Sequence, residues 1–357
     1  MAQEKALPTA NTFIPKYQEL SMNIKKYVFI VVLLLCSAVV SDRVEAKDLI
    51  FHMGYEMIQV IDTENDSIID IPIKGAARDS SFSADKKFLY VTGSRRNISK
   101  IDLEKMQVVG SITVEEKGWE RFVTGMALNQ DGKTGYVNVF SRRTEKGEVV
   151  IGHPEILQID LDNGKILRSM EVPFGVSSLS LVENDTKLYA IGQDLYSIDV
   201  SKKQMQIVDT LSMFERGLNL LAFWHYTAEN DGVWLSPYYS PEGMGLMSID
   251  TKNGKITETM IQGEPPFAYN AIYSPDKTKV YSVMDEVAVI DLKTRTYSQI
   301  VPIPEGTCYG VIPTSDGKKL YAGAGGATVT VFDVETMLPI KVLQMETDGM
   351  GLRRLTL

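Results

Sequence analysis

The feature that most constrains this chain is a short repeat in which an apolar residue precedes aspartate at the end of an expected strand. It occurs seven times in the 357 residues, at Asp62, Asp102, Asp160, Asp199, Asp250, Asp291 and Asp333. Successive aspartates are 40, 58, 39, 51, 41 and 42 residues apart, which gives a base spacing near 40 with two longer intervals. Such a period is typical of propeller blades. The repeat therefore predicts an all-β fold, a seven-bladed β-propeller with four antiparallel strands per blade.

The clearest unit is the stretch 270–303, which contains four expected strands at 271–273, 279–283, 286–291 and 296–301. A second marker, a polar turn followed by a strand with Tyr or Trp, precedes most of the aspartates, at 83–91, 129–137, 183–191, 228–235 and 314–322. We expect each repeated aspartate to accept hydrogen bonds from backbone N–H groups of the following turn. That role is structural rather than catalytic.

The two ends of the repeat region predict how the ring closes. Residues 48–52, 57–62 and 67–73 supply only three strands of a blade, and residues 351–357 form a strand with no blade of its own. We predict that this last strand is the innermost strand of the first blade, because closure hides both sheet edges. A lone blade cannot bury its two faces, so residues 47–357 are predicted to be one propeller domain, preceded by an extension and signal peptide at 1–46.

The N-terminal segment has the organisation of a secretory signal. The segment 22–26, which ends with Lys25 and Lys26, precedes fourteen uncharged residues at 27–40, and Val44-Glu45-Ala46 is the small-residue cleavage site. We predict cleavage after Ala46 and a periplasmic location, since fourteen residues are few for a bilayer span. The alternative is an N-terminal membrane anchor. Met1 and Met22 are both possible starts.

Charge and cysteine content narrow the possible partners. The net charge of −9 argues against nucleic acid, which needs clustered Lys and Arg. The basic pairs at 95–96, 142–143 and 353–354 are each predicted to be solvated loops or edges. Cys36 lies in the segment expected to be removed, and Cys308 is predicted to be a small buried residue. No CxxCH haem-attachment motif is present.

Loop lengths predict that the two faces of the ring differ. Short turns between first and second strands and between third and fourth strands fall on one face, interpreted as inert scaffold. The irregular stretches 140–155 and 237–245 are expected on the other face. Aromatic residues gather at the beginnings of first strands, namely Trp119, Phe122, Phe174, Phe214, Phe267, Tyr269 and Tyr309. They either contact a ligand or only plug the mouth of the ring.

No catalytic set emerges from the sequence. His52, His153 and His225 are far apart, and only His153 and His225 can lie on the irregular face; neither of these two has a metal-ligand partner at helical or hairpin spacing. Residues 323–326 read as a loop between strands rather than as a nucleotide site. We therefore predict no catalytic residue, no metal site and no cofactor in this chain.

Three stretches carry a resemblance to a known family: residues 220–239 (LLAFWHYTAENDGVWLSPYY), residues 187–199 (KLYAIGQDLYSID) and the run 267–342. They resemble the beta subunit of quinohemoprotein amine dehydrogenase, and the chain is also similar to the methylamine dehydrogenase heavy chain. The resemblance covers nearly all of residues 47–357 and rests mainly on the first two stretches. It implies a periplasmic heterotrimer that oxidises primary amines to aldehydes.

The resemblance also implies partners and a site. A dihaem cytochrome c alpha subunit would hold two haem c groups, and a small gamma subunit would hold cysteine tryptophylquinone. We hypothesise that aromatic residues of the propeller dock the gamma subunit and line part of the amine pocket, namely Phe223, Trp224, His225, Tyr238, Tyr239, Phe267, Tyr269 and Tyr309. The alternatives are a stand-alone periplasmic binding propeller, or a lactonase-like enzyme with carboxylates and a metal around the central channel. Phe223 and Trp224 could equally be core residues.

Overall fold

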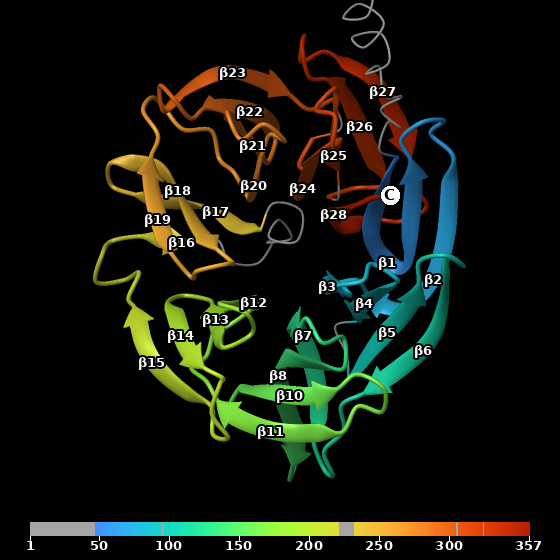
Figure 1. Ribbon diagram of the computed structural model, residues 1–357, viewed down its shortest axis with the longest axis vertical. Helices are drawn as coiled ribbons and strands as arrows, with labels where there is room; N and C mark the ends of the chain where they lie inside the picture. The colour runs from blue at the N-terminus through green and yellow to red at the C-terminus, as the bar shows by residue number, and fades with distance from the viewer. Residues whose placement is uncertain (1–46, 94–95, 221–231, 305, 324) are drawn as a thin grey trace, which may run out of the picture. The chain divides into compact units, whose positions relative to one another are not determined.

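The computed structural model describes residues 47–93, 96–220, 232–304, 306–323 and 325–357. Seven antiparallel sheets surround a central axis (Figure 1), which confirms the predicted seven-bladed β-propeller. The first blade combines β28 (Gly349–Thr356), β1 (Asp48–Asp62) and β2 (Ile68–Ala76). Among the described residues, no helix has the length and apolar character that crossing a membrane requires.

The other six blades follow in chain order, each beginning with its innermost strand. Blade two is β3 (Asp79–Phe82), β4 (Phe88–Thr92), β5 (Asn97–Asp102) and β6 (Gln107–Thr113). Blade three is β7 (Glu120–Leu128), β8 (Thr134–Glu145), β10 (Glu155–Asp160) and β11 (Ile166–Glu171), with β9 (Glu148–Ile151) paired to the end of β8. Blade four is β12 (Ser178–Val182), β13 (Lys187–Ile191), β14 (Leu195–Asp199) and β15 (Gln206–Leu211).

The last three blades have the same order. Blade five is β16 (Asn219–Leu220), β17 (Val233–Ser240), β18 (Gly243–Asp250) and β19 (Ile256–Met260). Blade six is β20 (Asn270–Tyr273), β21 (Lys279–Val283), β22 (Glu286–Asp291) and β23 (Thr296–Pro302). Blade seven is β24 (Gly310–Pro313), β25 (Lys319–Gly323), β26 (Thr328–Asp333) and β27 (Pro339–Gln344).

The closing blade shows how the ends of the domain meet. The first half of β1 pairs with β28, from Asp48 opposite Thr356 to Gly54 opposite Gly349, and the second half pairs with β2. The two halves of β1 lie antiparallel to each other, so that Thr63, just after β1, returns to Asp48 at its start. The backbone N and Oγ1 of Thr63 both donate to Asp48 O, at 3.2 and 2.9 Å. The blade thus has the four antiparallel segments predicted from the sequence, and the C-terminal strand is the innermost of them.

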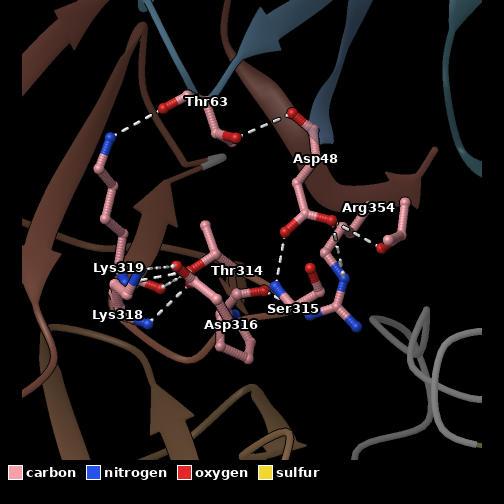
Figure 2. A network of polar contacts seen from close by, with 10 residues as sticks. Asp48, Thr63, Thr314, Ser315, Asp316, Lys318, Lys319 and Arg354 are labelled. Carbon is pink, nitrogen blue, oxygen red and sulfur yellow. Dashed lines mark hydrogen bonds and ion pairs between the residues drawn. The ribbon is translucent and has the colours of Figure 1, made fainter. Parts of the chain in front are cut away.

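A polar network joins the closing blade to blade seven (Figure 2). The carboxylate of Asp48 accepts hydrogen bonds from Thr356 Oγ1 at 2.6 Å and from the backbone N of Ser315 at 2.5 Å. Lys319 Nζ donates to Thr63 O at 2.8 Å. These contacts link residues more than 250 positions apart, so the ring is held closed by side chains as well as by strand pairing.

The core lies between blades rather than inside them. The middle strands β21 and β22 are buried on both faces, whereas the outermost strand β27 is mostly exposed. Stacked sheets bury both faces of a middle strand, which is why these strands are nearly continuous in apolar residues. The Tyr or Trp of the second sequence marker fills the space between blades. Tyr189, for example, is buried and donates to Gly254 O of blade five at 2.8 Å.

The repeated aspartates have the structural role expected from the sequence. Asp291 Oδ1 accepts hydrogen bonds from the backbone N of Lys293 at 2.9 Å and of Thr294 at 2.8 Å. Asp199 accepts from the backbone N and Oγ of Ser201, and these bonds, together with Lys202, lower its pKa to about 2. Each carboxylate thus fixes the turn between the third and fourth strands.

Candidate functional site

The strand directions define two faces of the ring. Successive strands of a blade are antiparallel, so the connections between second and third strands lie on the same face as those between blades. We call this the loop face; it carries, for example, residues 171–178 and 211–219. The opposite turn face carries the connections between first and second and between third and fourth strands, such as 274–278 and 292–295.

One of the irregular stretches predicted for the loop face is in fact regular. Residues 237–245 were expected to form a loop, but β17 continues to Ser240 and β18 starts at Gly243, which leaves only two connecting residues. Gly243 adopts φ +128° and allows this tight reversal. Residues 140–155 form mainly the extension of β8 and its partner β9, with the turn at Lys146 and Gly147 in positive φ.

The candidate docking residues have different exposures. Tyr238 is only 3% exposed and belongs to the core between blades four and five, where its ring occupies the space that a Cβ on Gly245 would take. This burial removes Tyr238 from an exposed docking surface. Phe223, Trp224 and His225 lie outside the described residues.

Two pairs of the remaining candidates are in contact on the loop face. The rings of Tyr239 and Phe267 have centroids 5.9 Å apart, and those of Tyr269 and Tyr309 are 5.3 Å apart in an edge-to-face arrangement. The Tyr239 hydroxyl accepts a hydrogen bond from the backbone N of Ala268 at 2.6 Å, which fixes the connection between blades five and six. Burial raises the pKa of Tyr239 above its ordinary value.

Exposed phenylalanines extend this aromatic region around the loop face. Phe214 is 90% exposed and Phe267 is 73% exposed, in the connections before blades five and six. Phe174, 55% exposed, lies before blade four and packs against His153 at a centroid distance of 5.8 Å. We define the aromatic surface as these residues together with the tyrosines above, namely Phe174, Phe214, Tyr239, Phe267, Tyr269 and Tyr309. Exposed apolar side chains gathered on one face are typical of an interaction site.

The extension of blade three adds paired arginines and aromatic rings to the loop face. The guanidinium of Arg143 lies 4.3 Å from the centre of the Trp119 ring, and that of Arg142 lies 5.1 Å from Phe122. The sequence predicted these aromatic residues on this face but not their pairing with arginines. Pairing of β7 with the end of β8, where Glu120 lies opposite Arg142, brings the rings and the arginines together.

The turn face and the channel hold a feature that the sequence did not reveal. A pocket of about 490 Å³, which we call the channel pocket, is lined by residues of the innermost strands β3, β7, β12 and β28 and of the turns that follow β3, β7 and β12. Blade five adds Gly232, Trp234, Thr251 and Lys252 to this lining. Arg353 and Arg354 line it and are 3% and 8% exposed, so the prediction that this basic pair is solvated was wrong. The pair is buried because β28 is innermost and its two neighbouring blades cover it.

The arginines of β28 contact both neighbouring blades. Arg353 donates to Ser80 Oγ at 2.9 Å and lies 3.4 Å from Asp79 Oδ1 of blade two. Arg354 Nη1 donates to Pro313 O of blade seven at 2.5 Å. In the described part of the chain, no group of three or more His, Cys, Asp or Glu residues is placed to hold a metal ion.

Cys308 is buried between blades, as the sequence predicted for a small residue. It packs among apolar side chains shared by blades six, seven and one, such as Val311 and Leu352. The thiol therefore belongs to the core that joins these blades.

Comparison with known proteins shows the fold alone. No protein-family model and no curated protein sequence matches this chain. The dihydro-heme d1 dehydrogenase NirN in complex with DHE is 14% identical, with 87% of this chain and 76% of that chain covered and a TM-score of 0.53. A putative 6-phosphogluconolactonase from Bacteroides fragilis is 12% identical (88% and 99% covered, TM-score 0.55). A functionally unknown protein from Desulfotomaculum acetoxidans is 12% identical (86% and 98% covered, TM-score 0.59). At these identities the likeness is one of architecture.

Proposed function

We propose that this chain is the cofactor-free propeller subunit of a periplasmic quinohemoprotein amine dehydrogenase, which oxidises primary amines to aldehydes. Its partners would be a dihaem cytochrome c alpha subunit and a small gamma subunit that carries cysteine tryptophylquinone. The amine-oxidising activity and these partners are inferred from the sequence resemblance, and secretion is inferred from the residue pattern of the N-terminal segment. The chain itself would act as a scaffold and line part of the amine pocket.

The observation that supports a docking role is the aromatic surface. Phe214 and Phe267 are 90% and 73% exposed although they are large and apolar. On the same face, the side chains of Tyr269 and Tyr309 are partly buried, and their rings are in edge-to-face contact. Rigid aromatic side chains bury a large area on binding at a small cost in conformational entropy, so they are common at the centres of interfaces.

The experiment compares two exposed apolar residues on opposite faces. Phe267→Ser removes a side chain from the aromatic surface, whereas Leu338→Ser removes one of similar exposure, 62%, from the turn face. Both variants are expected to fold, because neither side chain is buried. We expect Phe267→Ser to reduce recovery of the haem-bearing and quinone-bearing chains when the protein is purified from its native host, and Leu338→Ser to leave recovery unchanged.

A second measurement tests the contribution to the amine pocket. In a complex that still assembles, Tyr269→Ala is expected to raise the Michaelis constant for primary amines several-fold. Purification of the parent chain without a haem or quinone subunit would refute the proposed complex. That result would favour the alternative of a stand-alone periplasmic binding protein.

The lactonase-like alternative depends on carboxylates converging on the channel. The carboxylate of Asp79, which lines the channel pocket, accepts a hydrogen bond from the backbone N of Met126 at 2.9 Å and faces Arg353. A carboxylate engaged in this way is a structural link between blades. This observation favours the scaffold role over metal-assisted hydrolysis.

A further inference from the structure

We propose that the channel pocket binds a small organic anion that carries hydroxyl groups, at a site separate from the aromatic surface. Its volume of about 490 Å³ lies in the range usual for small-molecule sites. Its walls come from blades one to five, so the site exists only in the closed ring. The turn face, interpreted from the sequence as inert scaffold, would then carry a function of its own.

The charge of the pocket lining favours an anion. Four basic side chains line it, Arg353, Arg354, Lys86 and Lys252, against two acidic ones, Asp79 and Asp185. This excess of positive charge occurs in a chain whose net charge is −9. Both acidic groups are also engaged, because Asp79 faces Arg353 and Asp185 accepts a hydrogen bond from the backbone N of Gln130 at 2.6 Å.

The guanidinium of Arg354 is the group with the clearest unmet hydrogen-bonding capacity. Its side chain is 8% exposed, and its Nε is buried without a hydrogen-bond partner. The nearest carboxylate oxygen, Asp48 Oδ1, is 4.0 Å from Nε and already accepts a hydrogen bond from Thr356 Oγ1 (Figure 2). Nη1 donates to Pro313 O, so Nε is the part of this guanidinium that lacks a partner. A buried charge is costly unless it is fully compensated, so an anion in the pocket would stabilise the positive charge of Arg354.

The remaining polar lining suits a ligand with hydroxyl groups. Ser80 and Ser81 of β3 and Ser178 and Ser180 of β12 line the pocket, and all four are buried. Ser80 Oγ already accepts a hydrogen bond from Arg353. A serine hydroxyl both donates and accepts hydrogen bonds, so this lining matches a polyol better than a bare inorganic anion. The arginines would bind the charged group, which is either a carboxylate or a phosphate ester.

Calorimetric titration of the purified chain at low ionic strength tests the proposal with three probes. D-gluconate presents a hydroxylated carboxylate, glycerol 3-phosphate a hydroxylated phosphate ester, and acetate a bare carboxylate. We expect one of the hydroxylated probes to bind with a Kd below about 1 mM, and acetate to bind at least about tenfold more weakly. The stronger of the two hydroxylated probes identifies the charged group. Binding of neither, or equal binding of acetate, would overturn the proposal.

Variants place the bound anion in the channel. Arg354→Gln is expected to weaken binding of the preferred probe at least about tenfold. The matched control is Arg96→Gln, an exposed arginine paired with Glu115 on the loop face, which should bind like the parent. Because Arg354 also contributes to ring closure, Ser180→Ala and Lys252→Gln provide a test that does not depend on that contact. Parent-like affinity in both of these variants would refute the site.

This inference stands apart from the docking proposal. Loss of anion binding in Ser180→Ala should leave recovery of partner subunits unchanged, and Phe267→Ser should leave anion binding unchanged. Failure of one proposal therefore says nothing against the other.

Discussion

The buried histidine of the first blade makes the stability of the whole ring dependent on pH. His52 lies on β1, its backbone pairs with Leu352 of β28, and its side chain is 0% exposed. Neither ring nitrogen has a hydrogen-bond partner. Burial lowers the pKa of His52 from 6.5 to about 4, because the charged imidazolium would lose its hydration without gaining a counter-ion. Protonation is therefore easier in the unfolded chain than in the folded one.

The sign and size of the effect follow from this difference. Between pH 6.5 and about 4 the unfolded chain binds one more proton at this position, so the free energy of unfolding falls by about 1.4 kcal/mol for each pH unit of acidification. The full loss is about 3.4 kcal/mol and is complete only below about pH 3, because near pH 4 half of the folded chains have also bound the proton. At pH 4.5 the loss is about 2.7 kcal/mol. This window lies above the range in which the turn aspartates with lowered pKa values titrate.

Urea unfolding followed by tryptophan fluorescence at pH 7.5, 5.5 and 4.5 measures the effect. His52→Leu removes the titrating group and fills the same apolar space, so we expect it to be as stable as the parent at pH 7.5 and about 2.7 kcal/mol more stable at pH 4.5. The control is His153→Leu, which alters an exposed histidine on the loop face and should follow the parent. Parallel pH profiles for the parent and His52→Leu would show that His52 is not buried in its neutral form.

Three further predictions concern closure, packing and turns. Deleting residues 350–357 removes most of β28 and exposes the edge of β1, so cooperative thermal unfolding near the parent temperature is expected to disappear; a parent-like transition would contradict the closure. Gly245→Ala places a Cβ 2.2 Å from the Tyr238 ring and should destabilise the fold by about 1–3 kcal/mol in urea, whereas Gly326→Ala, where a Cβ meets open space, should be neutral. Asp333→Ala removes hydrogen bonds to the following turn and should lower the urea midpoint at neutral pH. Because those bonds depress the pKa of Asp333, their stabilisation is lost as pH falls below about 4, and the two midpoints should then converge.

The fold could be predicted from the sequence because its signals are local and repeated. Each repeated aspartate bonds to a backbone N–H two or three residues ahead, as Asp291 does to Lys293 and Thr294, so the spacing of these aspartates counts the blades directly. Ring closure was predictable for a related reason. The first blade has only three strands of its own, and residues 351–357 form a strand without a blade. Pairing these two is the arrangement that hides both sheet edges.

The aromatic surface was predicted only in part. Phe267, Tyr269 and Tyr309 lie where the sequence placed them, since the connections between blades must reach one face. Tyr238 does not lie on that surface, because the alternation of side chains along β17 turns it into the core between blades four and five, while Tyr239 points toward the connection to blade six. The tight turn at Gly243 sets that register, and the apparent irregularity of residues 237–245 concealed it.

The sequence by itself determined the number of blades, the order of their strands and the way the ring closes, because these depend on patterns along the chain. Only the tertiary structure decided the environments of His52, Arg353 and Arg354. Closure places β28 innermost and lays blade seven and blade two against it, so residues that resemble surface groups in the sequence become buried. Burial, and with it the pKa of His52 and the unmet hydrogen bonds of Arg354, depends on neighbours hundreds of residues away, which no local pattern records.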